Sequence, residues 1–242
     1  MGRKMQEEML TLEKFEEASE IVKKVTLETK LVYSDYFSAQ TGNRVYLKPE
    51  NLQFTGAYKL RGAYYKMSTL TDEERAKGLI TASAGNHAQG VGFASRDMKI
   101  PATICIPAGA PISKIQATRS YGANVVLVDG VYDDAYAEAV RLRDEQGLTF
   151  IHPFDDYRVM AGQGTIGLEI LEQLPDVDVI LVPIGGGGLA TGVSTLAKLL
   201  NPNVTVIGVE PSGAASMKAS LEAGHVVTLP TASTIANGVA VK

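Results

Sequence analysis

The stretch that decides the fold is VDVILVPIGGGGLATGVSTLAKLL, residues 177–200. It begins with a run of apolar, mostly β-branched residues, Val177–Val182, which is typical of a strand buried on both faces. Four glycines follow, and Leu189–Leu200 then repeats apolar residues at helical spacing. Because glycine has no Cβ, the loop can turn successive backbone N–H groups inward at the positive end of the helix. The stretch therefore predicts a strand–loop–helix unit that binds a phosphate group.

A lysine nearer the start of the chain, Lys59, stands in a setting that suits covalent chemistry. It follows a turn of small residues (55–57) and begins a predicted helix, with Gly56 and Gly62 on either side. Burial among apolar neighbours lowers the pKa of an ammonium group, and a neutral amine can attack an aldehyde to form a Schiff base. This segment alone is explained better by a surface lysine at a helix start, but the phosphate loop reverses that preference. An aldehyde-binding lysine and a phosphate loop together indicate pyridoxal 5′-phosphate as the cofactor.

Predicted strands and helices alternate along the chain. An amphipathic helix covers Phe15–Val25, and another helix begins with a capping box of Thr71 and Glu74. A further helix, with a period near 3.6, covers Val131–Leu142. Such alternation predicts an α/β protein with a parallel sheet covered on both faces. The predicted strands are Val45–Lys48, Leu79–Ser83, Ala102–Pro107, Val125–Asp129, Phe150–Phe154, Val177–Pro183 and Val204–Glu210.

The composition is that of an ordinary globular protein, and the length suggests two domains. Of the 242 residues, 45% are hydrophobic and 21% are charged, and the net charge of −4 argues against nucleic acid or a membrane surface as a partner. No apolar run approaches membrane-spanning length, and the first ten residues lack the apolar core of a signal peptide. The one cysteine, Cys105, excludes an internal disulfide and is predicted to lie in the core. We therefore expect a cytoplasmic protein that acts on a small molecule.

Four segments match one enzyme family in order and spacing. Residues 50–59 (ENLQFTGAYK) resemble the pyridoxal-lysine signature of serine/threonine dehydratases, and residues 83–90 (SAGNHAQG) resemble their loop for the substrate carboxylate. Residues 162–170 (GQGTIGLEI) and the glycine loop complete the set. The similarity runs from about Leu31 to the last residue. The chain is thus identified as a member of this family of fold-type II pyridoxal-phosphate enzymes, and it resembles the threonine dehydratases (threonine ammonia-lyases) within it.

The resemblance implies a fold like that of the tryptophan synthase β subunit, with two open parallel-sheet domains. Residues 51–151 would form a small domain that carries the reactive lysine and the carboxylate loop. Residues 1–50 and 152–242 would form a larger domain that carries the phosphate loop and faces the lysine across a cleft. We also expect copies of the chain to assemble into a homo-oligomer.

The same resemblance predicts that part of the larger domain is missing. In the family, a later strand carries a Ser, Thr or Cys that hydrogen-bonds the pyridine nitrogen of the cofactor, and no such motif follows Gly188 here. We therefore expect a truncated form of the family with low activity by itself. A chain of this kind could alternatively bind the cofactor without turnover, as a regulatory subunit.

The resemblance assigns roles to particular residues. Lys59 would hold the cofactor as a Schiff base and, once freed, take the Cα proton of the substrate. Asn86 would hydrogen-bond the ring oxygen of the cofactor. The cofactor phosphate would be bound by Gly185, Gly186, Gly187, Gly188 and Leu189. The substrate carboxylate would be bound by Ser83, Ala84, Gly85, Asn86 and His87.

The implied reaction is β-elimination from L-threonine, and also from L-serine, to give 2-oxobutyrate or pyruvate and ammonia. This chemistry belongs to amino-acid metabolism, including isoleucine biosynthesis. No carboxylic acid is placed by the sequence to protonate the leaving hydroxyl, so the cofactor phosphate is expected to do so, as in the family. Racemases of the family carry a serine where this chain has Ala84, and because alanine cannot transfer a proton, elimination is favoured over racemisation.

The glycine loop also permits a different enzyme class. Gly185-x-Gly187-x-x-Ala190 follows a predicted strand directly, and Glu210 ends the next one, as in an NAD-binding Rossmann oxidoreductase with the acid on the ribose. This remains the enzymatic alternative. A second GxGxxG sequence, residues 162–167, lies too far from its preceding strand for a dinucleotide site and is predicted to be a closely packed helix.

The histidines and acidic residues do not have the sequence spacing of metal ligands. His152 and His225 stand apart from carboxylates and cysteines in the sequence and are interpreted as structural, and His87 could simply cap or pack at a helix start. Glu210 resembles a cation-site carboxylate of some relatives, but Ser216 stands where a further acid would be expected. We therefore predict no metal site.

Overall fold

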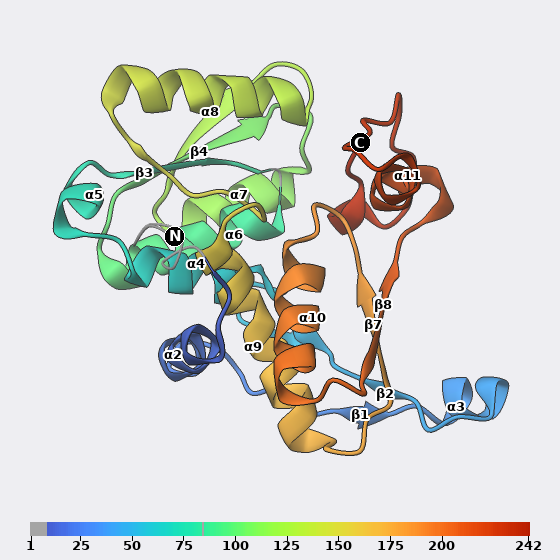
Figure 1. Cartoon of the computed structure of the whole chain (residues 1–242). Coiled ribbons are helices and arrows are strands. Elements are labelled where there is room, and N and C mark those ends of the chain that lie inside the picture. Colours follow the sequence, from blue (N-terminus) through green and yellow to red (C-terminus); the bar gives the residue numbers. More distant parts are fainter. Residues whose placement is uncertain (1–8, 84) are drawn as a thin grey trace.

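The computed structural model describes residues 9–83 and 85–242, so Ala84 of the predicted carboxylate loop lies outside the described residues. Helices and strands alternate over most of this range, as expected for an α/β protein. Helix α9 (Tyr157–Gln173) lies centrally (Figure 1). A four-stranded parallel sheet with its helices lies to one side of it, and a two-stranded parallel sheet lies to the other. Helix α9 packs against three other helices, namely α2 (Leu12–Val22), α4 (Lys59–Ser68) and α10 (Gly188–Leu200).

The larger sheet is parallel, and its strands lie in the order β5-β4-β3-β6. Leu79 pairs with Ala102 between β3 and β4, and Ile104 pairs with Val125 between β4 and β5. The strands are β3 (Leu79–Ala82), β4 (Ala102–Pro107), β5 (Asn124–Val128) and β6 (Thr149–Phe150). Helices connect consecutive strands, as parallel pairing requires, and they are α6 (Asn86–Met98), α7 (Ile112–Ser120) and α8 (Tyr132–Gln146).

Each face of this sheet is covered by helices and has its own apolar core. Successive residues of β4 point to opposite faces because the side-chain period of a strand is two. Ile104 and Ile106 pack with residues of α4, α6 and α7 on one face. Cys105 is fully buried on the other face with Ala135 and Ala139 of α8, which confirms its predicted place in the core.

The stretch 177–200 forms one strand of the second parallel sheet and the helix that packs on it. Strands β7 (Val179–Pro183) and β8 (Thr205–Val209) pair in parallel. Ile180 of β7 packs with Val193 of α10 and Ile170 of α9. The predicted order of strand, glycine loop and helix is therefore confirmed, and it places the glycines at the carboxyl end of β7. The expectation that this strand is buried on both faces is wrong, because Val179 and Leu181 are exposed while Ile180 and Val182 are buried.

Two glycines let α9 approach its neighbours closely. A Cβ at Gly162 would lie 2.6 Å from the Cα of Gly62 on α4. A Cβ at Gly164 would lie 2.3 Å from the ring of Phe15 on α2. Both distances are too short for a side chain, so these positions require glycine. The 162–167 sequence is thus part of a closely packed helix, as predicted, and does not form a dinucleotide loop.

The remaining elements lie outside the two parallel sheets. Strands β1 (Val32–Tyr33) and β2 (Tyr46–Leu47) form an antiparallel pair, and α3 (Asp35–Thr41) lies between them in the sequence. Short helix α5 (Asp72–Ala76) has the predicted capping box of Thr71 and Glu74. The chain after β8 forms η2 (Ser212–Ala214), α11 (Ser216–Ala223) and η3 (Asn237–Val239). None of the helices in the described ranges has the length and apolar character that a membrane span needs.

One predicted strand is wrong in its length. Residues 150–154 were expected to be extended, but β6 ends at Phe150 and the chain then forms an irregular loop. Pro153 cannot donate to a strand ladder, and the imidazole of His152 accepts the backbone N–H groups of Phe154 and Asp155. The loop brings these residues to the functional site.

Candidate active site

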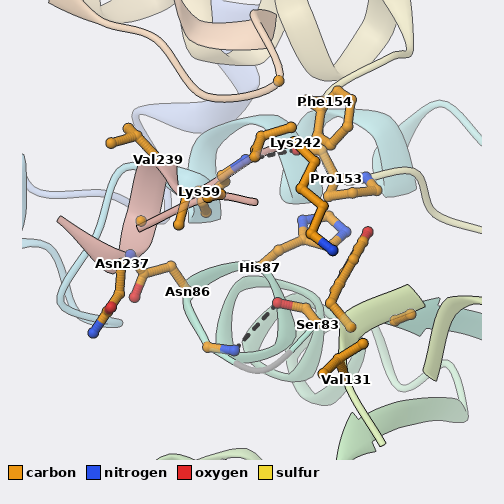
Figure 2. Close-up of a pocket in the computed structure, with 18 of the residues that line it drawn as sticks. Lys59, Ser83, Asn86, His87, Val131, Pro153, Phe154, Asn237, Val239 and Lys242 are labelled. Atoms are coloured by element: carbon orange, nitrogen blue, oxygen red, sulfur yellow. Dashed lines mark hydrogen bonds between the residues drawn. The ribbon is translucent and has the colours of Figure 1, made fainter. Parts of the chain in front are cut away.

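A cavity of about 810 Å³ lies at the carboxyl ends of β3 and β7. This is where ligands bind in open α/β sheets, and the volume suits a cofactor with a small substrate. Figure 2 shows Lys59, His87, Pro153 and Phe154 around the cavity. Predicted site residues that line it are Lys59, Ser83, Gly85, Asn86, His87 and Gly186.

Lys59 is the first residue of α4, and its amine lies in an apolar setting. Its Nζ donates a hydrogen bond to the backbone carbonyl of Pro153 at 2.7 Å. The rings of Tyr58 and Phe154 lie 5.6 and 6.0 Å from the nitrogen, and no carboxylate forms an ion pair with Lys59 among the contacts of the described chain. Desolvation lowers the pKa of Lys59 from 10.5 to about 8. The amine is therefore far more often neutral near pH 7 than that of an ordinary lysine.

This setting predicts an unusual pH dependence for Lys59 in the cofactor-free chain. Only a neutral amine reacts with an amine-labelling reagent, so the rate at Lys59 should rise through a midpoint near pH 8. Exposed lysines should have midpoints near the ordinary value of about 10.4. Peptide mass spectrometry after brief labelling at several pH values measures each lysine separately. A midpoint at Lys59 equal to that of exposed Lys77 would contradict the prediction.

The segment after β3 brings polar groups to the same cavity. The hydroxyl of Ser83 accepts a hydrogen bond from the Gly85 N–H at 3.2 Å, and Asn86 begins α6. The N–H groups at this helix start have no partner within the helix, which suits them to an anionic ligand. Ala84, predicted to share this role, lies outside the described residues.

His87 is a buried, neutral member of this segment. Its Nε2 lies 3.1 Å from the carbonyl oxygen of Ile151, so Nε2 carries the proton and donates. Its Nδ1 is then an acceptor, and it is buried without a hydrogen-bond partner among the described residues. Desolvation, together with a smaller effect of the Lys59 charge, lowers the pKa of His87 to about 3. His87 thus brings an unpaired acceptor to the site without adding a positive charge.

The glycine loop faces these groups from the second sheet. Gly187 has a φ of 86° and is the residue before α10, where the left-handed conformation favours glycine. A Cβ at Gly186 would lie 2.4 Å from the ring of Phe154, and one at Gly188 would lie 2.7 Å from the Phe154 carbonyl oxygen. Positions 186 and 188 therefore have no room for a side chain, because Phe154 packs closely against the backbone of the loop.

A single methyl group at Gly186 is expected to weaken phosphate binding. In Gly186→Ala the Cβ must displace the ring of Phe154, and overpacking of this kind costs about 1–3 kcal/mol, or roughly tenfold to a hundredfold in affinity. Gly109→Ala is the matched control, because a Cβ there meets no atom within 4 Å. Titration of each purified variant with pyridoxal phosphate, followed by absorbance, gives the dissociation constants. Equal affinity in the two variants would place the phosphate elsewhere.

A buried ionic network fixes the helix that carries Lys59. Arg61, only 1% exposed, pairs with Glu50 at 2.8 Å and with Glu169 of α9 at 2.6 Å. Lys48 also pairs with Glu169 at 2.6 Å, and Thr165 accepts from the guanidinium at 3.2 Å. Two cations thus face two carboxylates close to the start of α4.

Some contributors to the cavity were missed in the sequence. Pro153, Phe154, Tyr58 and Asp133 line it, and so does part of the segment 237–242. Proline inside a predicted strand was the one available signal for the first two, since it argues against a regular strand. Asp133 brings a carboxylate that the sequence did not place near the site. Leu189, predicted as a phosphate ligand, turns its side chain into the apolar core of β7, α9 and α10.

The geometry around Glu210 does not favour a dinucleotide site. Its two carboxylate oxygens accept the backbone N–H groups of Met217 and Lys218, each at 2.9 Å, so that it caps α11. Oxygens held in this way are not free for the hydroxyls of a ribose. Across residues 9–83 and 85–242, no group of three or more His, Cys, Asp or Glu side chains could hold a metal ion.

The residues present fit a phosphate-bearing aldehyde. An amine of lowered pKa can bond to the aldehyde, and a glycine loop that a Cβ would fill can receive the phosphate. The unpaired Nδ1 of His87 is a polar group whose burial is costly without a ligand or water. Together these features define a site for an aldehyde cofactor held at both ends.

Comparison with known proteins gives the family. The family model described as pyridoxal-phosphate dependent enzyme matches residues 22–242. The chain therefore belongs to the family of pyridoxal-phosphate-dependent enzymes, which rules out the NAD-dependent oxidoreductase considered from the sequence.

Similar proteins within this family include enzymes named as L-threonine ammonia-lyases or L-threonine dehydratases. The L-threonine ammonia-lyase of Thermotoga maritima is 52% identical over 234 residues, which is 97% of this chain and 58% of that protein. The catabolic L-threonine dehydratase of Escherichia coli K12 is 46% identical over 211 residues, 87% of this chain and 64% of that protein. The chain thus spans about three fifths of the length of these relatives.

Solved structures confirm the fold class. The processed form of threonine deaminase isoform 2 from Solanum lycopersicum superposes with a TM-score of 0.89 and 44% identity, covering 97% of this chain and 70% of that one. Maize serine racemase superposes with a TM-score of 0.90 and 36% identity, covering 95% and 71%. Both are similar to this chain over nearly all of its length.

Proposed function

We propose that the protein catalyses the pyridoxal-phosphate-dependent β-elimination of L-threonine, and also of L-serine, to 2-oxobutyrate or pyruvate and ammonia. The observation that carries the proposal is a lysine amine of lowered pKa in one cavity with a glycine loop at a helix start. The names of the similar proteins from T. maritima and E. coli support threonine as the substrate. Maize serine racemase, similar in structure, supports serine as a second one.

Lys59 has two tasks in this proposal. It holds the cofactor through the aldehyde, and its freed amine takes the proton from the substrate Cα, which requires the amine to be neutral. Its desolvated setting supports both tasks. When bound, pyridoxal phosphate would supply a ring that accepts the electrons of the resulting carbanion.

The other predicted residues bind and orient. Backbone N–H groups of Gly185–Gly188 and Leu189 would hold the phosphate, supported by their place before and at the start of α10. The side chain of Asn86 would hydrogen-bond the cofactor's ring oxygen. The substrate carboxylate would be bound by the segment Ser83–His87, where the start of α6 and the Ser83 hydroxyl offer donors.

Elimination is proposed over racemisation because of one residue type. Ala84 stands at the position where the family resemblance implies a serine in racemases. A methyl group cannot deliver a proton to the opposite face of the substrate. Ala84→Ser should therefore increase racemisation relative to elimination.

The wider setting follows from the same reaction. We assign the enzyme to the cytoplasm and to amino-acid metabolism, including isoleucine biosynthesis, and expect it to act as a homo-oligomer. A relative named as biosynthetic threonine dehydratase 2 of Solanum lycopersicum, 48% identical over 217 residues, supports the biosynthetic assignment. The site would lie between a small domain (51–151) and a larger one (1–50 with 152–242), supported by the separation of the two parallel sheets.

Fixation of the cofactor tests the site directly. The purified protein is mixed with pyridoxal phosphate, a visible absorbance band is recorded, and borohydride is added to make the attachment permanent. Peptide mapping should then find the added mass on Lys59. Release of 2-oxobutyrate after L-threonine is added tests turnover.

The outcomes separate the candidate functions. Fixation at Lys59 together with 2-oxobutyrate release supports the enzyme. Fixation without any turnover of threonine or serine would favour the non-catalytic cofactor-binding subunit. Fixation at no lysine, or only at exposed lysines, would overturn the proposal.

A further inference from the structure

The loop that follows β6 holds the amine of Lys59, and its start is firmly anchored. Ile151 is fully buried, and its N–H donates to the Ile80 carbonyl at 2.9 Å. The carbonyl of Ile151 accepts from the Thr81 hydroxyl at 2.8 Å and from His87 Nε2 at 3.1 Å. These bonds fix where the loop leaves the sheet.

The shape of the loop beyond this anchor depends on one imidazole. Nδ1 of His152 accepts the backbone N–H of Asp155 at 2.7 Å and that of Phe154 at 3.3 Å. Both donors are backbone amides, so Nδ1 must be unprotonated and the ring proton lies on Nε2. Immediately after this turn, Asp156 caps α9 by accepting hydrogen bonds from the N–H groups of Arg158 and Val159.

The surroundings of His152 keep the ring neutral. Its ring meets that of Phe154 edge to face, with centroids 4.8 Å apart, and that of Tyr136 on α8, at 6.4 Å. Desolvation lowers the pKa of His152, although the carboxylates of Asp155 and Asp156 oppose this. The charge of Lys59 acts in the same direction as desolvation.

The turn brings two groups to opposite parts of the site. The carbonyl of Pro153 accepts from Lys59 Nζ at 2.7 Å, and the ring of Phe154 lies against Gly186 of the glycine loop. In Figure 2 the dashed line joins Lys59 to Pro153, with Phe154 beside them. A carbonyl can only accept a hydrogen bond. It therefore fixes one N–H of the amine and leaves the nitrogen lone pair free to attack a carbonyl carbon or take a proton.

We infer that His152 is a positioning residue, whose Nδ1 builds the turn that holds the Lys59 amine on the Pro153 carbonyl and the Phe154 ring on the glycine loop. This rests on the proposed role of Lys59 as the residue that binds the cofactor aldehyde. From the sequence, His152 was interpreted only as a structural residue. The two backbone bonds to Nδ1 connect that role to the reactive amine.

Two substitutions separate the acceptor from the aromatic ring. His152→Asn keeps an acceptor, because Asn Oδ1 can accept the N–H groups two and three residues ahead, as in an Asx turn. His152→Phe keeps an aromatic ring for Phe154 and Tyr136 but has no acceptor. His225→Ala is the control for loss of a histidine, since His225 is exposed and lies away from the site, with its Nδ1 near the Ala223 carbonyl.

The first measurement is the rate at which pyridoxal phosphate becomes fixed to Lys59, trapped by borohydride and read by peptide mass. His152→Phe should fix the cofactor about tenfold more slowly, as expected for the loss of two hydrogen bonds that hold the amine in place. His152→Asn should stay within about threefold of the parent protein, because it retains the bonds. His225→Ala should match the parent protein.

The second measurement needs no cofactor. In His152→Phe, a relaxed loop admits water to Lys59, so the midpoint of its pH-dependent labelling should move up from about 8 towards 10.5. In His152→Asn the midpoint should stay near that of the parent. Urea unfolding of each variant shows whether it is folded under the assay conditions.

The inference is overturned if folded His152→Phe matches the parent in both measurements. It is also overturned if His152→Phe behaves normally and His152→Asn does not, since ring packing would then be the role of the residue. If the parent protein itself fixes no cofactor at Lys59, the proposed function fails, and the labelling midpoints still decide whether His152 positions the amine.

Discussion

Replacing Lys59 with alanine is expected to abolish fixation of pyridoxal phosphate and to lower 2-oxobutyrate release by about 10³-fold or more. The side chain would supply both the bond to the cofactor and the base, and among the described residues only this lysine donates to the Pro153 carbonyl. The fold should survive, because removing a desolvated amine whose only strong partner is a carbonyl costs little stability. Absorbance, borohydride trapping and the 2-oxobutyrate assay measure the loss, and urea unfolding measures the stability.

Lys77→Ala is the control for this substitution. Lys77 is exposed on the surface and forms an ion pair with exposed Glu73, so its removal should change none of these quantities. Threonine turnover by Lys59→Ala at a rate near that of the parent protein would show that another group does the chemistry.

The second large effect is expected at Arg61, on the stability of the fold. Arg61→Met preserves much of the side-chain volume but leaves Glu50 and Glu169 buried without the guanidinium that both of them contact. Removing one partner of a buried ion pair typically costs about 3–5 kcal/mol, because a buried charge loses its compensation. Urea unfolding with linear extrapolation measures the free energy of unfolding.

Two further variants test the reason for this loss. Adding Glu50→Gln to Arg61→Met should recover part of the stability, since Glu50 then carries no uncompensated charge while Glu169 still pairs with Lys48. Arg141→Met should change the unfolding midpoint very little, because Arg141 is half exposed and its pairs with Glu138 and Glu145 are on the surface. A loss at Arg61 no larger than that at Arg141 would contradict the role assigned to the network.

The local elements were largely predictable because local chemistry specifies them. The β-branched run before the glycines forms β7, and the capping box of Thr71 and Glu74 begins α5 as predicted. Strand Ala102–Pro107 has the predicted bounds. The exception is the stretch 150–154, where apolar residues suggested a strand but His152 and Pro153 formed a turn. A side chain that accepts backbone N–H groups removes the donors on which a strand depends.

The candidate site likewise has parts that the sequence predicts and parts that only packing decides. The sequence motifs predicted Lys59, the segment Ser83–His87 and the glycine loop as parts of the site, because each has a local pattern of residue types. The hydrogen bond from Lys59 to Pro153, 94 positions along the chain, has no local pattern. Neither has the contact between Phe154 and Gly186.

By itself, the sequence determined the alternation of strands and helices, the glycine loop, the lysine and the enzyme family, since these depend on residue types at short spacing. Only the tertiary structure decided how reactive that lysine is. Its pKa depends on desolvation, and the Phe154 ring that lies beside the amine comes from a distant part of the chain. The tertiary structure also decided that Glu210 caps a helix, because both of its partners lie seven or eight residues away across a turn of the backbone. Burial and long-range hydrogen bonds arise from packing, and spacing along the chain does not specify them.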